Sequence, residues 1–199
     1  MSPHQTTARL TDEEGHFLLD LARRTIEDAL GLAPEEPARP DLQTAALASH
    51  RGVFVTLKMA DQLRGCIGSL EADRPLVDNV RANARNAAFH DPRFAPLTVD
   101  EWPQVQIELS VLSTPRKLAY PSAEALPEHL TPRVDGVVIR KGYSSATFLP
   151  QVWKQLPRPQ DFLAHLCLKA GLSASAWRKG DLEVETYQVQ SFEEGVKTP

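Results

Sequence analysis

The strongest constraint on the fold is the alternation of polar and apolar side chains from Gln104 to Val111. Successive side chains of a β-strand point to opposite faces of a sheet, so this pattern predicts a strand over 104–112. One face of that strand is expected to be buried and the other polar. The expected buried residues are Val105, Ile107, Leu109 and Val111, and the expected polar residues are Gln104, Gln106, Glu108 and Ser110.

Hairpins and helices occur around this strand without a regular βαβ alternation. Further strands are expected at 52–58, 63–70, 134–140, 144–149 and 182–192. Helices are expected at 11–30, 73–89 and 161–170. The first helix begins with Thr11 and Glu14, which form a capping-box pattern. This order predicts an α+β fold with a largely antiparallel sheet, in which hairpins are packed by several helices.

The organisation and charge of the chain narrow the class of protein. We expect a disordered N-terminus over 1–10, a single domain over 11–192 and a frayed tail over 193–199. The N-terminal residues lack the apolar stretch of a signal peptide, and no apolar run approaches the ~20 residues that span a bilayer. A formal net charge of −4 gives no general attraction to nucleic acid or anionic membranes. The chain is therefore expected to be cytoplasmic, without membrane contact and without nucleic-acid binding.

The best candidate for chemistry is Cys66, one of two cysteines, in the segment Leu63-Arg64-Gly65-Cys66-Ile67-Gly68. In a strand, Arg64, Cys66 and Gly68 share one face, and a guanidinium beside a thiol favours the reactive thiolate. Gly65 and Gly68 would leave an open notch around the thiol for a ligand. The alternative is a packed cysteine that behaves as a small hydrophobe. Cys167, on a helix with apolar neighbours, is expected to lie in the core.

A second cluster, His90-Asp91-Pro92-Arg93-Phe94, directly follows a predicted helix. If the fold brings it beside Cys66, His90 could act as a base that Asp91 orients. His90 is equally well explained by the negative end of the helix dipole, and Arg93 by pairing with a carboxylate. Asp91 and Arg93 are nevertheless included as ligand-binding candidates.

Asp135 and Gln151 complete the candidate ligand-binding residues. Asp135 could line a cleft, although with Gly136 it is better explained as a turn into a strand. Gln151 follows a strand exit and is a possible polar contact. The histidines show no metal-ligand spacing, and no phosphate-loop or dinucleotide fingerprint occurs. No metal and no cofactor are therefore expected.

The segment 63–68 resembles the signature of the AMMECR domain family, whose prokaryotic members are called AmmeMemoRadiSam system protein A. Further similar blocks follow in the same order at 87–94, 96–98, 108–112, 135–137, 149–152 and 166–172. The resemblance implies an α+β fold with a larger and a smaller part and a cleft near the signature. It also implies Memo-like and radical S-adenosylmethionine partner proteins, but no settled activity. The signature itself points to Arg64, Gly65, Cys66 and Gly68.

Two functional hypotheses follow. In the first, a thiol-dependent enzyme in a modification pathway uses Cys66 as nucleophile, Arg64 as the neighbour that favours the thiolate, and His90 as proton carrier. In the second, a non-catalytic adaptor binds a ligand or protein at the 63–68 notch.

Overall fold

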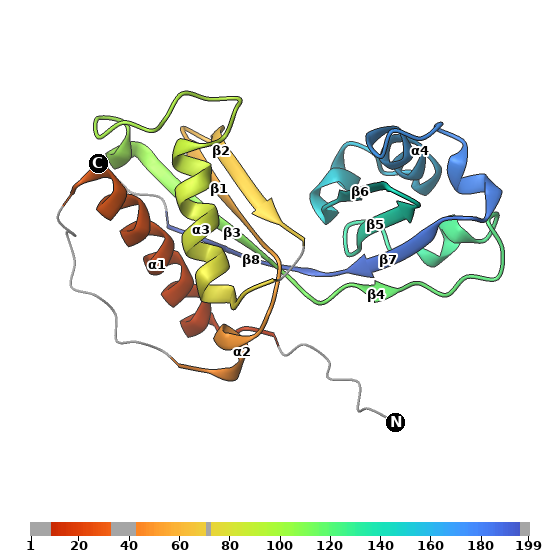
Figure 1. The fold of residues 1–199 in the computed structure, drawn as a ribbon, viewed down its shortest axis with the longest axis horizontal. Helices are drawn as coiled ribbons and strands as arrows, with labels where there is room; N and C mark the ends of the chain where they lie inside the picture. Colours follow the sequence, from red (N-terminus) through yellow and green to blue (C-terminus); the bar gives the residue numbers. More distant parts are fainter. Residues whose placement is uncertain (1–8, 33–42, 71–72, 196–199) are drawn as a thin grey trace. The chain divides into compact units, whose positions relative to one another are not determined.

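The computed structural model describes residues 9–32, 43–70 and 73–195, which form two compact units (Figure 1). Unit 1 takes in the described residues up to Leu112 and from Gln190 onward, and unit 2 comprises Ser113–Val189. Each unit has its own four-stranded antiparallel sheet and its own hydrophobic core. The expected α+β class is confirmed, and the span 11–192 expected to be one domain contains both cores.

The α-helices of the described residues are α1 (Asp12–Leu30), α2 (Ala45–Ala48), α3 (Leu76–Phe89) and α4 (Pro159–Lys169). The strands are β1 (Val53–Met59), β2 (Gln62–Ser69), β3 (Val105–Leu112), β4 (Arg116–Lys117), β5 (Gly136–Lys141), β6 (Ser144–Phe148), β7 (Glu183–Tyr187) and β8 (Val189–Glu193). Short 3-10 turns are η1 (Trp102–Gln104), η2 (Leu126–His129), η3 (Pro150–Lys154) and η4 (Ala176–Lys179). None of the described helices is both long enough and apolar enough to cross a membrane.

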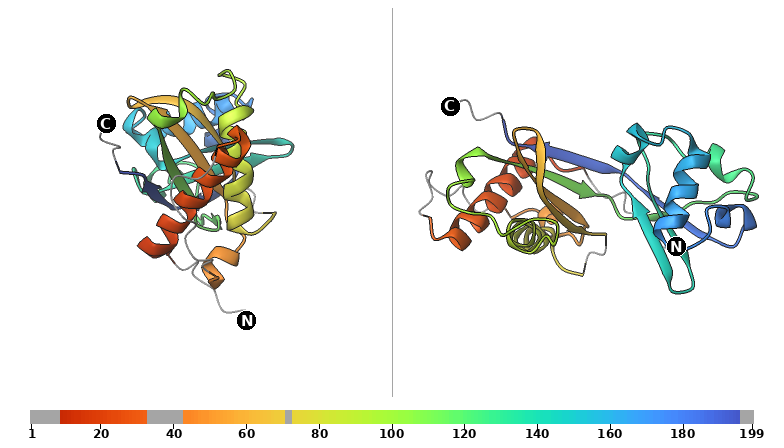
Figure 2. Two further views of the ribbon diagram at one scale, coloured as in Figure 1. Left: turned by 90° about the vertical axis from the view of Figure 1, so that its left-hand side faces the viewer. Right: turned by 90° about the horizontal axis from the view of Figure 1, so that it is seen from above.

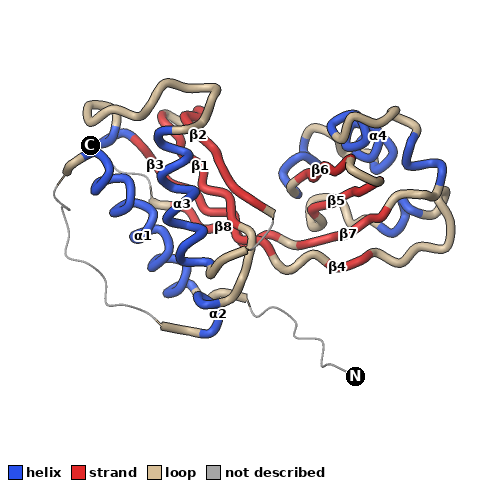
Figure 3. Tube along the Cα trace, viewed as in Figure 1, coloured by secondary structure: helices blue, strands red, loops and turns tan. Residues whose placement is uncertain are grey.

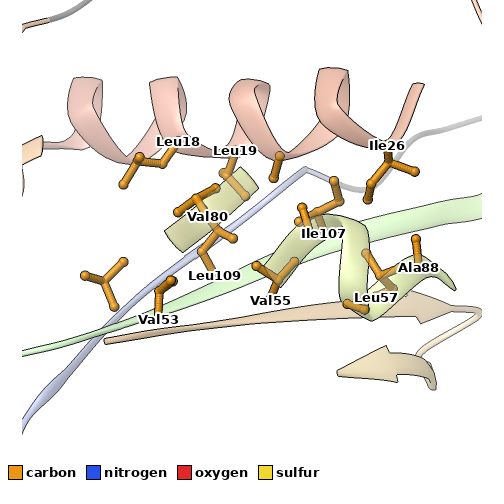
Figure 4. Close-up of a cluster of buried hydrophobic side chains, with 14 of the residues drawn as sticks. Leu18, Leu19, Ile26, Val53, Val55, Leu57, Val80, Ala88, Ile107 and Leu109 are labelled. Atoms are coloured by element: carbon orange, nitrogen blue, oxygen red, sulfur yellow. The ribbon is translucent and has the colours of Figure 1, made fainter. Parts of the chain in front are cut away.

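In unit 1, the helices α1 and α3 cover one face of the sheet, whose strand order is β2-β1-β3-β8 (Figure 2). The predicted alternation holds from Val105 to Leu109, where Ile107 and Leu109 lie in the core with Val53, Val55 and Leu57 of β1 (Figure 4). These side chains pack against apolar residues of the helices. The helix residues labelled in that view are Leu18, Leu19, Ile26, Val80 and Ala88. Ser110, expected on the polar face, is buried.

The hairpin β1–β2 positions the candidate cysteine. Its two-residue turn has Ala60 and Asp61 at φ of 47° and 61°, the left-handed conformation that matches the twist of a tight hairpin. A β-bulge between Leu57 and Lys58 then shifts the pairing by one residue on β2. Because of this shift, Thr56 lies opposite Cys66, whereas the regular pairing that starts at the turn would place it opposite Gly65.

The ends of the described chain are tied to unit 1. The backbone of Leu10, which is 4% exposed, exchanges two hydrogen bonds with the Gln190 side chain, at 2.9 and 2.7 Å. At the other end, Glu194 pairs with Arg23 and accepts a hydrogen bond from the Ile107 N–H. Glu193 and Glu194, in the stretch expected to fray, are thus held by β8 and by these contacts. The expected disorder over 1–8 and fraying over 196–199 lie outside the described residues.

In unit 2, the strand order is β4-β7-β5-β6, and the core contains Trp153 stacked on Phe162 of α4 at 3.7 Å between ring centroids. The strands expected over 134–140 and 144–149 are β5 and β6, which pair as an antiparallel hairpin. The helix expected to begin at Asp161 begins at Pro159, because proline is well tolerated in the first turn.

The single strand expected over 182–192 is two strands that belong to different sheets (Figure 3). β7 pairs with β4 and β5 in unit 2, and β8 joins β3 in unit 1. Between them, Gln188 exchanges hydrogen bonds with Ser113, through Ser113 N–H to Gln188 O at 2.8 Å and Gln188 N–H to Ser113 Oγ at 2.9 Å. Side-chain alternation gives no information on which sheet a strand joins.

Candidate functional site

Cys66 lies on β2 with its thiol on the sheet face opposite the helices. On that face, the side chains of Thr56 and Cys66 are direct cross-strand neighbours. The Thr56 hydroxyl donates to the Cys66 Sγ at 3.3 Å, and Cys66 is partly exposed. The thiol is thus accessible and has a hydrogen-bond donor beside it, unlike Cys167 in the core of unit 2.

The backbone of Cys66 is held by the ion pair between Asp91 and Arg93. β2 is an edge strand, so one side of its backbone has no neighbouring strand. The Cys66 N–H donates to Asp91 Oδ2 at 2.8 Å, and Arg93 Nη2 donates to the Cys66 carbonyl at 3.1 Å. Arg93 also donates twice to the Asp91 carboxylate through its side chain, at 2.9 and 2.7 Å. The pair therefore occupies the position that a further strand would take.

Asp91 remains ionised in this arrangement. Its side chain is 2% exposed, and its pKa lies far below the usual range. The main cause is the hydrogen bonding from the Arg93 guanidinium, followed by the backbone N–H groups of Cys66 and Arg93, which together outweigh the cost of burial. The pKa of Arg93 is raised in turn, by Asp91 first and also by the Cys66 thiol, which its guanidinium approaches.

Arg64, expected to be the guanidinium beside the thiol, has other partners. It donates twice to the Glu101 carboxylate, at 2.8 and 3.0 Å, and once to the Ala95 carbonyl at 3.0 Å. The Arg64 hydrogen bonds, with further ones from Thr98, lower the pKa of Glu101 to about 2. Arg64 therefore anchors the segment between α3 and η1, and Arg93 is the arginine that contacts Cys66.

Phe94 lies between the two arginines. The guanidinium carbon of Arg64 is 5.8 Å from the centroid of the Phe94 ring, and that of Arg93 is 5.5 Å from it. Both distances fall in the range of cation–π interactions, which add a small attraction to each contact. The segment 91–101 is thus fixed against β2 by two ion pairs and one aromatic ring.

The two signature glycines are required by packing inside unit 1. A Cβ on Gly65 would lie 2.2 Å from the backbone oxygen of Ala87 on α3. A Cβ on Gly68 would lie 2.4 Å from the ring of Phe54 and 2.5 Å from the Val53 carbonyl. Close approach of the helix and of the Phe54 ring therefore accounts for both glycines, so neither needs an external ligand to explain it.

His90 is placed apart from the polar contacts of Cys66. It is the C-cap of α3, where its backbone N–H donates to the Asn86 carbonyl at 2.8 Å, and it is exposed. The groups that donate to the Asp91 carboxylate belong to Cys66 and Arg93, and the His90 ring is not among them. The structure thus brings Asp91 and Arg93 to Cys66 without forming the expected His90–Asp91 contact.

Asp135 and Gln151 belong to unit 2. The Asp135 carboxylate accepts from the Thr131 N–H at 2.7 Å, and the Asp135 carbonyl accepts from Trp153 Nε1 at 2.7 Å. These contacts are those of a turn, the explanation that the sequence favoured. Gln151 is exposed on η3. Within the ranges that the structure describes, no group of three or more histidine, cysteine, aspartate or glutamate side chains could hold a metal ion.

Two residues of the site were missed from the sequence. The Glu101 carboxylate accepts from Thr98, three residues before it, but its pairing with Arg64 had no sequence signal. Thr56 was placed on a strand without a role. Regular pairing from the turn would place Thr56 opposite Gly65. The contact of Thr56 with Cys66 depends on the bulge, which the sequence did not predict.

Comparison with known proteins identifies related chains over nearly the whole length. The AMMECR1 family model matches residues 19–192. The protein MK0488 of Methanopyrus kandleri is 40% identical, with 94% of this chain and 91% of that one covered. Mbar_A1807 of Methanosarcina barkeri is also 40% identical, with 93% and 92% covered. The crystal structure of the uncharacterized protein PH0010 from Pyrococcus horikoshii is similar at a TM-score of 0.80 and 34% identity, with 96% of each chain covered.

Proposed function

This chain belongs to the AMMECR1 family, and from that premise we propose that it is a thiol-dependent enzyme with Cys66 as its nucleophile. The observation that carries the proposal is the hydrogen bond from the Thr56 hydroxyl to the partly exposed Cys66 thiol at 3.3 Å. The reactive form of cysteine is the thiolate, and a donor aimed at the sulfur stabilises that form.

Arg93 takes the role first given to Arg64 in this proposal. Its guanidinium approaches the Cys66 thiol and, with Asp91, holds the cysteine backbone at both its N–H and its carbonyl. A nucleophile with a fixed backbone presents its sulfur in one direction, which reduces the entropy lost in reaching the transition state. Asp91 is then a positioning residue. His90 has no proton-carrying role in this reaction, because its ring does not donate to the Asp91 carboxylate.

We further propose that the enzyme acts in a modification pathway with Memo-like and radical S-adenosylmethionine proteins, the partners that the family resemblance implies. The non-catalytic adaptor is the alternative. Its sequence argument was an open notch at Gly65 and Gly68, and the internal packing of both glycines removes that argument. Enlarging these glycines would disturb the fold in either case, so that experiment does not separate the two functions.

The proposal is tested by the rate at which iodoacetamide alkylates Cys66 at pH 7, followed by mass spectrometry of the full chain. We expect Cys66 to react faster than a free cysteine in the same buffer, while buried Cys167 stays unmodified. Thr56→Val should slow the reaction of Cys66 about 3–10-fold, because it removes one hydrogen bond to the thiolate.

His90→Gln is the matched control and should leave the alkylation rate unchanged. If Cys66 reacts only when the chain unfolds, together with Cys167, it is a packing residue and the adaptor function replaces the enzyme. An unchanged rate in Thr56→Val would remove the observation on which the proposal rests.

A further inference from the structure

The sheet face that carries Cys66 also carries a row of charged and polar side chains. Pairing across β2, β1 and β3 places Cys66, Thr56 and Glu108 side by side, in that order. Neighbouring strands lie about 4.8 Å apart, so Glu108 is roughly 10 Å from Cys66 across the strands. A small molecule bound at the thiol on this face would therefore lie within reach of the electrostatic field of Glu108.

Among the described residues, three cations on this side of unit 1 each have a carboxylate partner. Lys58, on the same face of β1, pairs with Glu108 at 2.5 Å. Arg64 pairs with Glu101 and Arg93 with Asp91, each through two hydrogen bonds. The Asp91 side chain is 2% exposed, so a ligand cannot displace it without opening the structure. An anionic ligand would therefore find no unpaired cation among these three groups.

Further carboxylates add negative charge to this side of unit 1. Lys58 has a raised pKa, caused first by its hydrogen bond to Glu108 and also by the charges of Glu193 and Asp61. The described groups on and around the face thus include three cations and five carboxylates. The cations are Lys58, Arg64 and Arg93, and the carboxylates are Asp61, Asp91, Glu101, Glu108 and Glu193. At distances beyond direct contact, an excess of carboxylates repels anions.

We propose that the site at Cys66 selects an electrophile that is uncharged or positively charged where it meets the thiol, and discriminates against carboxylate- and phosphate-bearing substrates. The inference rests on the proposed function and specifies its substrate class. At short range, the Thr56 hydroxyl donates to the Cys66 sulfur and the Arg93 guanidinium approaches it. The surrounding carboxylates act over a longer range, on the approach of the substrate.

Three methanethiosulfonate reagents of different charge provide the test. In each reaction the Cys66 thiolate attacks the sulfenyl sulfur, forms a disulfide with it and releases methanesulfinate. The reagents carry a trimethylammonium-ethyl, a methyl or a sulfonatoethyl group. The rate at which each reagent modifies Cys66 is divided by the rate at which the same reagent modifies 2-mercaptoethanol. At low ionic strength, we expect the normalised rate of the cationic reagent to exceed that of the anionic one by about 3-fold or more. An anionic reagent that is equally fast or faster overturns the proposal.

Glu108→Gln tests the origin of the selectivity. Removing this carboxylate leaves Lys58 without its closest partner and should raise the normalised rate of the anionic reagent by about 2–4-fold. Glu13→Gln is the matched control, because Glu13 is exposed on α1, which covers the opposite face of the sheet. It should change the normalised rate of the anionic reagent less. Glu193→Gln should change the rate in the same direction as Glu108→Gln, and provides a second variant if Glu108→Gln does not fold.

If Glu108→Gln and Glu193→Gln change the rate of the anionic reagent no more than Glu13→Gln does, these carboxylates do not cause the selectivity and the proposal is overturned. The two proposals fail in different ways. If Cys66 reacts with none of the three reagents in the folded chain, the proposed function fails. If Cys66 is reactive but prefers the anionic reagent, only the substrate class is wrong.

Discussion

Asp91 holds the backbone of the candidate nucleophile. One carboxylate receives hydrogen bonds from the Cys66 N–H, the Arg93 N–H and the Arg93 guanidinium, all of them in a nearly solvent-free position. Hydrogen-bond donors around a buried carboxylate favour its ionised form, which agrees with the strongly lowered pKa of Asp91. Its removal therefore leaves several donors without an acceptor.

Asp91→Asn should lower the free energy of unfolding by about 2–3 kcal/mol, because the amide group then faces donors that it cannot satisfy. Urea denaturation measures the effect. Asp78→Asn is the control, since the Asp78–Arg81 pair is half exposed and its loss should cost no more than about 0.5 kcal/mol. Equal effects of the two changes would show that the Asp91 contacts contribute little to stability.

At the scale of elements, the contact of α3 with β2 sets the position of the whole site. Gly65 lets the helix backbone approach the strand so closely that a methyl group would collide with the Ala87 carbonyl. The segment that leaves α3 then carries Asp91 directly to the edge of β2. The spacing between α3 and β2 thus determines whether the Asp91–Arg93 ion pair can reach the backbone of Cys66.

Gly65→Ala should therefore destabilise the chain by about 2–3 kcal/mol or more, because either the helix or the strand must move. The thermal midpoint and the urea midpoint both report this loss. Gly195→Ala is the matched control, as a Cβ there would meet nothing within 4 Å, and it should stay within about 0.5 kcal/mol of the wild type. A tolerated Gly65→Ala would contradict the close packing of α3 on β2.

For the whole molecule, sensitivity to acid should be concentrated in unit 1. The pKa of Glu101 is lowered from 4.5 to about 2, mainly by Arg64, and that of Asp91 is lowered as well. A carboxylate with a lowered pKa stabilises the folded state above its unfolded pKa, and this contribution is lost as the pH falls through its folded pKa. For Glu101, the loss runs from about pH 4.5 down to about pH 2.

Hydrogen exchange at stepwise lower pH should accordingly show that β2 and the segment 91–104 lose protection before the sheet of unit 2 does. Glu101→Gln should remove on the order of 1–2 kcal/mol of stability near neutral pH, after allowance for screening at a partly exposed pair. The same variant should flatten the pH dependence between about pH 4.5 and 2. If unit 2 loses protection first, the ion pairs around Cys66 do not control acid unfolding.

The sequence by itself determined most of the local structure. The capping box at Thr11 and Glu14 is formed, with both hydrogen bonds present, and Gly31 ends α1 at a φ of 73°. Alternation in the first part of β3 and the strands of both hairpins were likewise predicted correctly. These features depend on residues that are close together in the chain, so their pattern can be seen in the sequence. The resemblance to the AMMECR family was also visible there, and family membership is confirmed.

Tertiary structure decided the partners of each side chain at the site. Arg64 is close to Cys66 in the sequence, whereas Arg93 is 27 residues away from it. The path of the chain after α3 brings Arg93 to the cysteine backbone and pairs Arg64 with Glu101 and Arg93 with Asp91. The bulge in β2 decided that Thr56 lies opposite Cys66. The stretch 182–192 reads as one strand, but its two halves pair with strands far away in the sequence.

The physical reason is the range of the interactions. Capping and turn formation are settled within a few residues, whereas ion pairs and strand partners depend on where distant segments meet. A bulge shifts every later pair by one residue, so one local irregularity changes which side chains are neighbours. The sequence therefore located Cys66 as the candidate site, and the tertiary structure decided which groups surround its thiol.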